Sequence, residues 1–172
     1  MEVEKKVCMI VASRDFRDEE FTEPKKIFEA AKIKVLVASS RLSPSKGYFG
    51  AIANPEILVE NVKVDEFDAI VFIGGSGAQE YFNNLSALKV AKDAFEKGKI
   101  VAAICIAPSI LANAGVLSGK KATSFSSEKG NLIKKGAMFT GVDVEVDGKI
   151  VTAEGPSSAG KFAKTILSLL SK

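Results

Sequence analysis

The sequence predicts an α/β fold, a three-layer α/β/α sandwich with helices on both faces of a mainly parallel sheet. Short, wholly apolar runs typical of buried parallel strands alternate with amphipathic segments typical of helices. Asp147-Gly148, between strand-like residues 142–146 and 150–153, indicates a late hairpin with antiparallel strands at one edge. The chain has 172 residues and 47% hydrophobic content, which suits a single domain over residues 1–172.

The first βαβ unit occupies residues 6–39. Residues 6–12 are nearly all apolar and predict the first strand, and residues 34–39 predict the second. A helix is expected to begin near Asp18 or Glu19, since acidic residues in a first turn suit the helix dipole. Pro24 is compatible with this helix only in its first turn.

The region after this unit mixes polar connections with a further strand. Residues 40–54 are rich in Ser, Gly and Pro and predict a loop, in which Tyr48 and Phe49 either cover a pocket or pack against the sheet. Residues 57–64 alternate weakly and suggest a short antiparallel segment. Residues 67–73 predict a buried strand.

Helical patterns dominate the second half of the chain. Residues 85–97 predict an amphipathic helix with four residues facing inward, Leu88, Ala91, Ala94 and Phe95. A short strand is expected at 122–124 and one helical turn at 131–135. A closing helix is expected from Ser157, with a buried stripe of Phe162, Ile166, Leu169 and Leu170.

Cys105 stands at a sharp strand-to-helix turn. Residues 100–104 predict a fully buried strand, and a helix is expected from Ala107, with Pro108 in its first turn and Gly115 as its C-cap. The single residue between them should be forced towards positive φ and exposed at the carboxyl end of the sheet. Cys105 should also be the one residue of the chain with a strained backbone. This is the geometry of a nucleophile elbow, with sulfur as the nucleophile.

Two interpretations of Cys105 remain open at this point. The following helix N-terminus should lower the thiol pKa and make the cysteine reactive. Alternatively, Cys105 is a small core residue, since free cysteines are often buried. The second cysteine, Cys8, lies inside the first predicted strand and is expected to pack in the core.

The glycine turn Gly74-Gly75-Ser76-Gly77 follows a strand at the same edge of the sheet. Its spacing fits neither the P-loop nor the dinucleotide-binding fingerprint, which disfavours a phosphate cradle. An oxyanion hole is the second reading, with the backbone N–H groups of Gly75 and Ile106 facing the sulfur. The third is a tight turn that glycine merely permits.

The sequence contains no histidine. This excludes Ser-His-Asp and Cys-His catalytic pairs within the chain and all histidine-based zinc motifs. No cofactor and no metal site is expected. The net charge of +3 is small and evenly distributed, so nothing indicates nucleic acid or membrane partners. The cysteine usage and the charged first residues suggest a cytoplasmic protein.

Four segments together resemble the ThiJ/PfpI superfamily, which includes the PfpI-type intracellular proteases and the Parkinson-associated protein deglycase. They are DEEFTEP, VFIGGSGAQEYF, AAICIAPSILANAGVLSGKKATS and VDGKIVTAEGP, and their order and spacing span nearly the whole chain. The resemblance implies a flavodoxin-like fold related to the class I glutamine amidotransferases. It also implies that Cys105 is the elbow nucleophile, that the carboxyl group of Glu20 touches its sulfur, and that Gly75 and Ile106 supply backbone donors.

The chain departs from the superfamily pattern at three positions. The proteases carry a histidine directly after the nucleophile, where this chain has Ile106. The deglycase branch carries a histidine where this chain has Phe125, and an arginine where it has Glu154. Phe125, Glu154 and also Gly74 are candidates for lining the pocket. The Cys-His protease mechanism is therefore excluded.

Two functional hypotheses follow. In the first, Cys105 attacks a small reactive carbonyl and Glu20 moves protons, a glyoxalase- or deglycase-like activity. In the second, Cys105 is a non-enzymatic sensor that peroxide oxidises. A PfpI-like peptidase is the weakest reading. The expected partners are a small-molecule carbonyl or peroxide and further copies of the chain, as a homodimer or larger oligomer.

Overall fold

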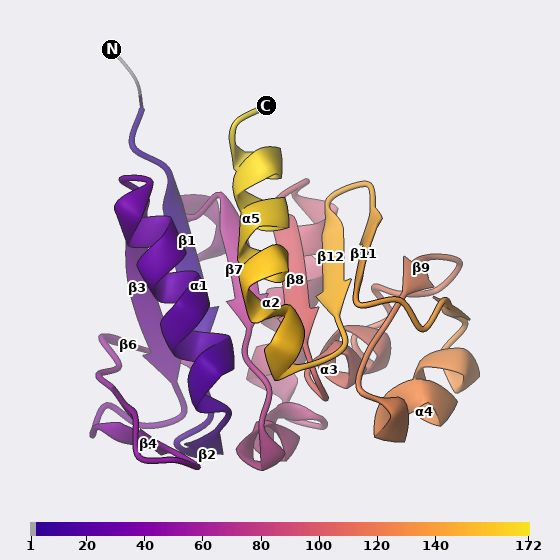
Figure 1. Cartoon of the computed structure of the whole chain (residues 1–172), viewed down its shortest axis with the longest axis horizontal. Coiled ribbons are helices and arrows are strands. Elements are labelled where there is room, and N and C mark those ends of the chain that lie inside the picture. The colour runs from indigo at the N-terminus through magenta and orange to yellow at the C-terminus, as the bar shows by residue number, and fades with distance from the viewer. Residues whose placement is uncertain (1–2) are drawn as a thin grey trace.

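A seven-stranded sheet forms the centre of the protein in the computed structural model, which describes residues 3–172 (Figure 1). The strand order is β11-β12-β8-β7-β1-β3-β6. The strands are β1 (Lys6–Ile10), β3 (Lys34–Ser39), β6 (Ile57–Leu58), β7 (Ala69–Phe72), β8 (Ile100–Ile104), β11 (Val144–Asp147) and β12 (Ile150–Ala153). Every pairing in this sheet is parallel except that of β11 with β12.

Helices cover both faces of the sheet. Helices α1 (Asp18–Ala30) and α5 (Ala159–Leu170) lie on the face towards the viewer in Figure 1, and α2 (Leu85–Glu96) and α3 (Pro108–Asn113) lie behind it. Each layer has its own apolar cluster: Phe28 of α1 and Phe162 of α5 pack in one, and Val90 of α2 and Ile110 of α3 in the other. The expected three-layer sandwich is therefore observed. In the part of the chain described, no helix is long and apolar enough to cross a membrane.

The late hairpin is present, but only one of its strands is antiparallel to the rest of the sheet. β12 pairs in parallel with β8, and β11 returns along the outer edge. The segment expected to be antiparallel at 57–64 is also different. Its strand β6 pairs in parallel with β3, and 3₁₀ turns follow at Val59–Asn61 and Val64–Glu66. Two paired residues carry too little periodicity to indicate strand direction.

Two small sheets flank the main one, and the sequence anticipated only one of their strands, the short strand expected at 122–124. The predicted loop 40–54 contains β4 (Ser45–Gly47) and β5 (Ile52–Ala53), which join β2 (Arg14–Phe16) in a three-stranded sheet. β9 (Lys121–Ala122) pairs with β10 (Met138–Phe139) near helix α4 (Lys129–Lys134). Strands of two or three residues are set by tertiary pairing rather than by local pattern.

The helices differ from expectation in three details. Pro24 lies well inside α1 rather than in its first turn, and it is buried. It is tolerated at the cost of one helical hydrogen bond. Phe95, expected to face inward, is 38% exposed at the end of α2, and Leu169 is only partly buried. The remaining 3₁₀ turns are Ser76–Tyr81, Ser126–Glu128 and Pro156–Ser158.

Candidate active site

Cys105 forms the sharp turn between β8 and α3, at the carboxyl edge of the sheet. Its φ of 65° lies in the left-handed region, as predicted, whereas the expectation that it would be the one strained residue is wrong. Asp15 and Lys32 also have positive φ. The backbone of Cys105 is held on both sides, because its N–H donates to the Ala153 carbonyl at 2.9 Å and its carbonyl accepts from the Phe125 N–H at 2.8 Å.

Glu20 lies in the first turn of α1 and is fully buried, with 0% of its surface exposed. Among the described residues, no partner makes a hydrogen bond of regular geometry with either carboxyl oxygen. Burial raises the pKa of Glu20 to about 8, and contacts with the Cys105 thiol and the Gly74 backbone offset part of this effect. The carboxyl group is therefore mainly neutral at pH 7, and it faces the sulfur.

Gly74 makes this approach possible. A Cβ atom added at Gly74 would lie 2.5 Å from Glu20 Oε1 and 2.6 Å from the Cβ of Cys105. The next residue, Gly75, has a φ of 99°, and a Cβ there would lie 2.3 Å from the backbone nitrogen of Arg17. The two glycines let the end of β7 pack directly against the segment that carries Glu20.

The expectation of an acidic thiol is not supported. Burial, followed by the negative charge that Glu20 carries when ionised, raises the pKa of Cys105 to about 12. Contacts with the Gly75 and Ile106 backbone N–H groups lower it, but by less. α3 has only six residues, and desolvation of the sulfur outweighs the favourable field at its N-terminus. Cys8 is also fully buried, and its thiol pKa is likewise raised to about 12.

The backbone donors expected for an oxyanion hole lie where that reading requires. The N–H groups of Gly75 and Ile106 both reach the sulfur of Cys105, one from the glycine turn after β7 and one from the elbow itself. An oxygen bound to the reacting centre would find two donors there. Ile106 has no proton to exchange through its side chain, so proton transfer at the sulfur depends on Glu20 or water.

Phe125 and Glu154 line one pocket, of about 210 Å³. Its other lining residues are Ser124, which ends one of the quoted superfamily segments, and Ser126, Phe139 and Gly141, which no sequence motif marked. Each of the two segments that hold the Cys105 backbone contributes to this pocket, since Phe125 donates to Cys105 and Glu154 follows the acceptor Ala153. The pocket therefore lies beside the elbow.

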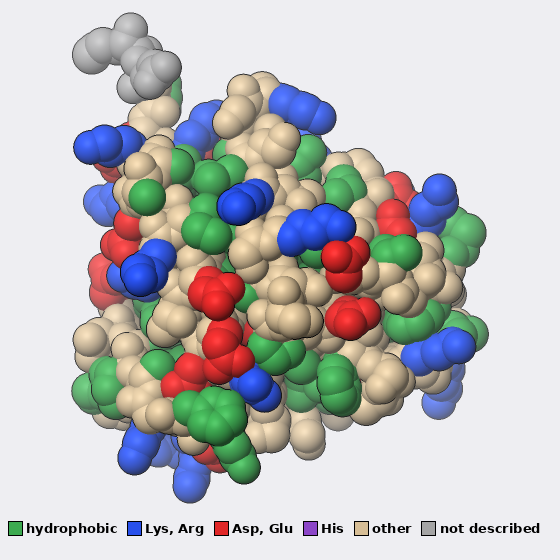
Figure 2. All heavy atoms as spheres, in the orientation of Figure 1, with side chains coloured by type: hydrophobic (Ala, Val, Ile, Leu, Met, Phe, Trp, Pro, Cys, Tyr) green, Lys and Arg blue, Asp and Glu red, His purple; other side chains and the backbone are tan. Residues whose placement is uncertain are grey.

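Tyr48 and Phe49 are largely exposed to solvent, so neither the expected pocket cover nor the expected packing against the sheet is observed. They are 67% and 65% exposed at the tip of the β4–β5 hairpin. Figure 2 shows apolar side chains (green) exposed along the lower edge of this face. Asp18 fixes this tip, because its carboxylate accepts from the N–H groups of Phe49 at 2.8 Å and Ala51 at 2.7 Å. The sequence showed Asp18 only as a first-turn acid. Its tertiary role had no local signal.

No cluster of three or more His, Cys, Asp or Glu side chains within residues 3–172 is placed to hold a metal ion. At the elbow, one thiol, one mainly neutral carboxyl group and two backbone donors lie together.

The sequence profile of the DJ-1/PfpI family matches residues 5–169. The chain belongs to the DJ-1/PfpI family. An uncharacterized protein of Methanocaldococcus jannaschii is 39% identical to it, over 97% of this chain and 83% of that protein. A deglycase of Pyrococcus abyssi is 34% identical, over 94% of this chain and 98% of the deglycase.

A solved structure confirms the fold assignment within the DJ-1/PfpI family. The ThiJ/PfpI domain protein of Brachyspira murdochii superposes with a TM-score of 0.95 at 33% identity and covers 98% of both chains. The resemblance to the ThiJ/PfpI superfamily and the flavodoxin-like fold that it implied are therefore both confirmed.

Proposed function

We propose that this DJ-1/PfpI protein is a cysteine-dependent enzyme that acts on small reactive carbonyl compounds, with a glyoxalase- or deglycase-like reaction. The observation that carries the proposal is the fully buried carboxyl group of Glu20 against the thiol of Cys105. The name of the Pyrococcus abyssi relative gives further support. Curated relatives named deglycase support this general role, and the substrate class is the part that we propose.

The pair suits addition of a thiol to an aldehyde. Sγ of Cys105 bonds to the aldehyde carbon, the C=O π bond breaks, and its oxygen takes up a proton. A neutral carboxyl group gives a proton from one oxygen and receives one at the other, so Glu20 relays the thiol proton to the substrate oxygen without a net change in charge. The N–H groups of Gly75 and Ile106 stabilise negative charge on that oxygen.

With a 2-oxoaldehyde the reaction continues to a 2-hydroxy acid. A proton leaves C1 of the hemithioacetal and another arrives at C2, so C1 is oxidised and C2 is reduced without an external oxidant. Glu20 is the proton carrier at this step. Water then cleaves the resulting thioester, which releases the 2-hydroxy acid and restores the thiol of Cys105.

The test is lactate formation from methylglyoxal. Wild type should produce lactate, whereas Cys105→Ser should produce none and Glu20→Gln should lose at least about 100-fold in rate, the usual contribution of a general acid–base group. Glu60→Gln is the matched control, because it removes an exposed carboxylate on a 3₁₀ turn that makes no contact with the Cys105 thiol, and it should retain full activity. Wild type without turnover would contradict the proposal.

A second candidate function is peroxide sensing by Cys105. Two N–H groups at the sulfur favour it, since they would hold the oxygens of a sulfinate. The raised thiol pKa counts against it, because peroxide reacts with the thiolate. Intact mass after dilute peroxide distinguishes the two functions: a sensor gains one or two oxygen atoms on Cys105 and shows no methylglyoxal turnover.

We further propose that the protein works in the cytoplasm as a homodimer or larger assembly. A reducing compartment would keep Cys105 as a thiol. Sedimentation velocity at micromolar concentration tests the assembly, and a strict monomer would contradict it.

A further inference from the structure

The pocket beside Cys105 has one charged side chain among its lining residues, the half-buried Glu154. Its walls are otherwise two aromatic rings, Phe125 and Phe139, with two serines and a glycine. Phe125 is 47% exposed, so solvent reaches this wall. A molecule that occupies the pocket therefore meets a carboxylate, hydroxyl groups and aromatic faces.

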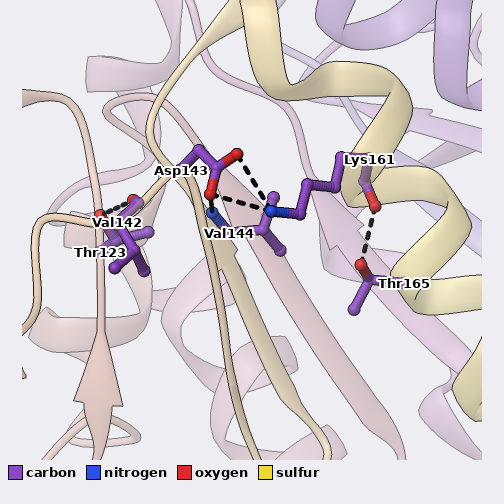
Figure 3. Close-up of polar contacts among 6 residues, drawn as sticks. All are labelled: Thr123, Val142, Asp143, Val144, Lys161 and Thr165. Carbon is purple, nitrogen blue, oxygen red and sulfur yellow. Dashed lines mark hydrogen bonds and ion pairs between the residues drawn. The ribbon is translucent and has the colours of Figure 1, made fainter.

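The neighbouring acidic groups are already engaged. Asp143, whose carbonyl accepts from the Glu154 N–H at 2.9 Å, forms an ion pair with Lys161 of α5 at 3.0 Å (Figure 3). Glu128 accepts from Ser109 and Ser127, each at 2.7 Å. Within residues 3–172, no salt bridge or side-chain hydrogen bond satisfies the carboxylate of Glu154.

Lys129 lies near the pocket wall on its outer side. Lys129 places its Nζ atom 5.6 Å from the centre of the Phe139 ring, where it makes a cation–π contact. It is exposed and belongs to α4, outside the lining residues. The charge that faces into the pocket is therefore negative.

We infer that Glu154 makes the site select carbonyl substrates that bear a cationic group over those that bear an anionic group. The inference rests on the proposed function, because it places the reacting carbonyl at Cys105 and the rest of the substrate in this pocket. A protonated amine or guanidinium would pair with the Glu154 carboxylate and lie against the Phe125 ring. A carboxylate or phosphate there would be repelled and would find no cationic lining group.

The test measures whether the site around Cys105 prefers a cationic or an anionic reagent, and it does not require catalytic turnover. Two methanethiosulfonate reagents of similar length are used, one with a trimethylammonium group and one with a sulfonate group. The Cys105 thiolate attacks the divalent sulfur of the reagent, the bond from that sulfur to the sulfonyl group breaks, and a disulfide forms as methanesulfinate leaves. Labelling is followed by intact mass, and because Cys8 is fully buried, Cys105→Ser gives the background.

Wild type should react faster with the cationic reagent, and Glu154→Gln should lower the cation-to-anion rate ratio about tenfold, as expected for the loss of one charge from a partly solvated site. The effect should shrink in 0.5 M salt, because salt at this concentration screens exposed charges. Glu145→Gln is the matched control, since Glu145 is a half-buried carboxylate on β11 outside the pocket and should leave the ratio unchanged. Melting curves verify that both variants fold.

Each result decides between the proposals. An unchanged ratio in Glu154→Gln, or a native thiol that reacts with neither reagent while the denatured protein reacts with both, overturns the inference. A lowered ratio without methylglyoxal turnover in any variant supports the charge preference and overturns the proposed enzymatic function. A lowered ratio with turnover supports both.

Discussion

Glu20 holds a mainly neutral carboxyl group against the thiol of Cys105 although the two residues are far apart in the sequence. The first turn of α1 supplies the carboxyl group, and the turn after β8 supplies the thiol. Their titrations are coupled, because an ionised Glu20 raises the pKa of Cys105. As the pH rises, the pair therefore loses its first proton mainly from the carboxyl group of Glu20.

Glu20 should make the wild type lose stability as the pH rises. Its pKa is raised from 4.5 to about 8, so its stabilising contribution is complete below pH 4.5 and is lost as the pH approaches 8. In Glu20→Gln this loss should be absent. The unfolding free energy of the variant minus that of wild type should therefore rise by about 4 kcal/mol between pH 4.5 and pH 8. Urea titrations across this range measure it, and a constant difference would show that Glu20 ionises normally.

The same variant should make Cys105 more acidic than in wild type. Removing the Glu20 carboxylate removes the second largest cause of the raised thiol pKa, while burial still holds it above its ordinary value. At pH 9 the Glu20→Gln thiol should react with iodoacetamide up to about tenfold faster, since one pKa unit is a tenfold change in thiolate. A wild-type thiol that titrates below about 8.5 would contradict the raised pKa of Cys105 and support the acidic thiol expected from the sequence.

Gly74 and Gly130 should respond oppositely to alanine. At Gly74 the added methyl group would meet Glu20 Oε1 and Cys105 Cβ, so Gly74→Ala should lose about 1–3 kcal/mol of unfolding free energy and shift the Glu20 pKa. At Gly130, inside α4, the methyl group meets nothing within 4 Å. Gly130→Ala should be neutral or gain up to about 1 kcal/mol. Equal effects in chemical denaturation would show that the packing around Gly74 is not tight.

Asp18 should keep the tip of the β4–β5 hairpin in one ordered conformation. Asp18→Ala removes the acceptor for the Phe49 and Ala51 N–H groups, so the variant should lose about 2 kcal/mol, as for hydrogen bonds to a charged group. Hydrogen exchange of these two amides should accelerate, while the amides of β8 remain protected. Asp18→Asn keeps one acceptor oxygen and should show an intermediate effect. Unchanged exchange in Asp18→Ala would mean that the tip is held by other contacts.

The elbow was predictable because its signal is local. The buried strand ends at Ile104 and the helix begins at Pro108. The chain must therefore turn sharply at Cys105, which explains its positive φ. The hairpin at Asp147-Gly148 was predictable for the same reason, since the turn chemistry is contained in the two residues.

The features missed depend on contacts distant in sequence. Asp15 adopts positive φ where β2 packs on Gly75. Lys32 is an exception, because its positive φ belongs to the local ending of α1, where the Ile33 N–H donates to the Phe28 carbonyl at 2.9 Å. The thiol pKa was predicted in the wrong direction because a helix N-terminus is visible in the sequence, whereas the burial of the sulfur beside Glu20 appears only in the folded chain.

The absence of histidine gives this protein an unusually simple acid–base chemistry near neutrality. Histidine is the side chain that ordinarily changes charge between pH 5 and pH 8, and this chain has none. Among the described side chains with a resolved shift, Glu20 alone is brought into that neighbourhood. Calorimetry in buffers of different ionisation enthalpy would therefore measure proton uptake or release on ligand binding without a contribution from histidine. The protons measured near neutral pH could then be assigned to the buried carboxyl group of Glu20.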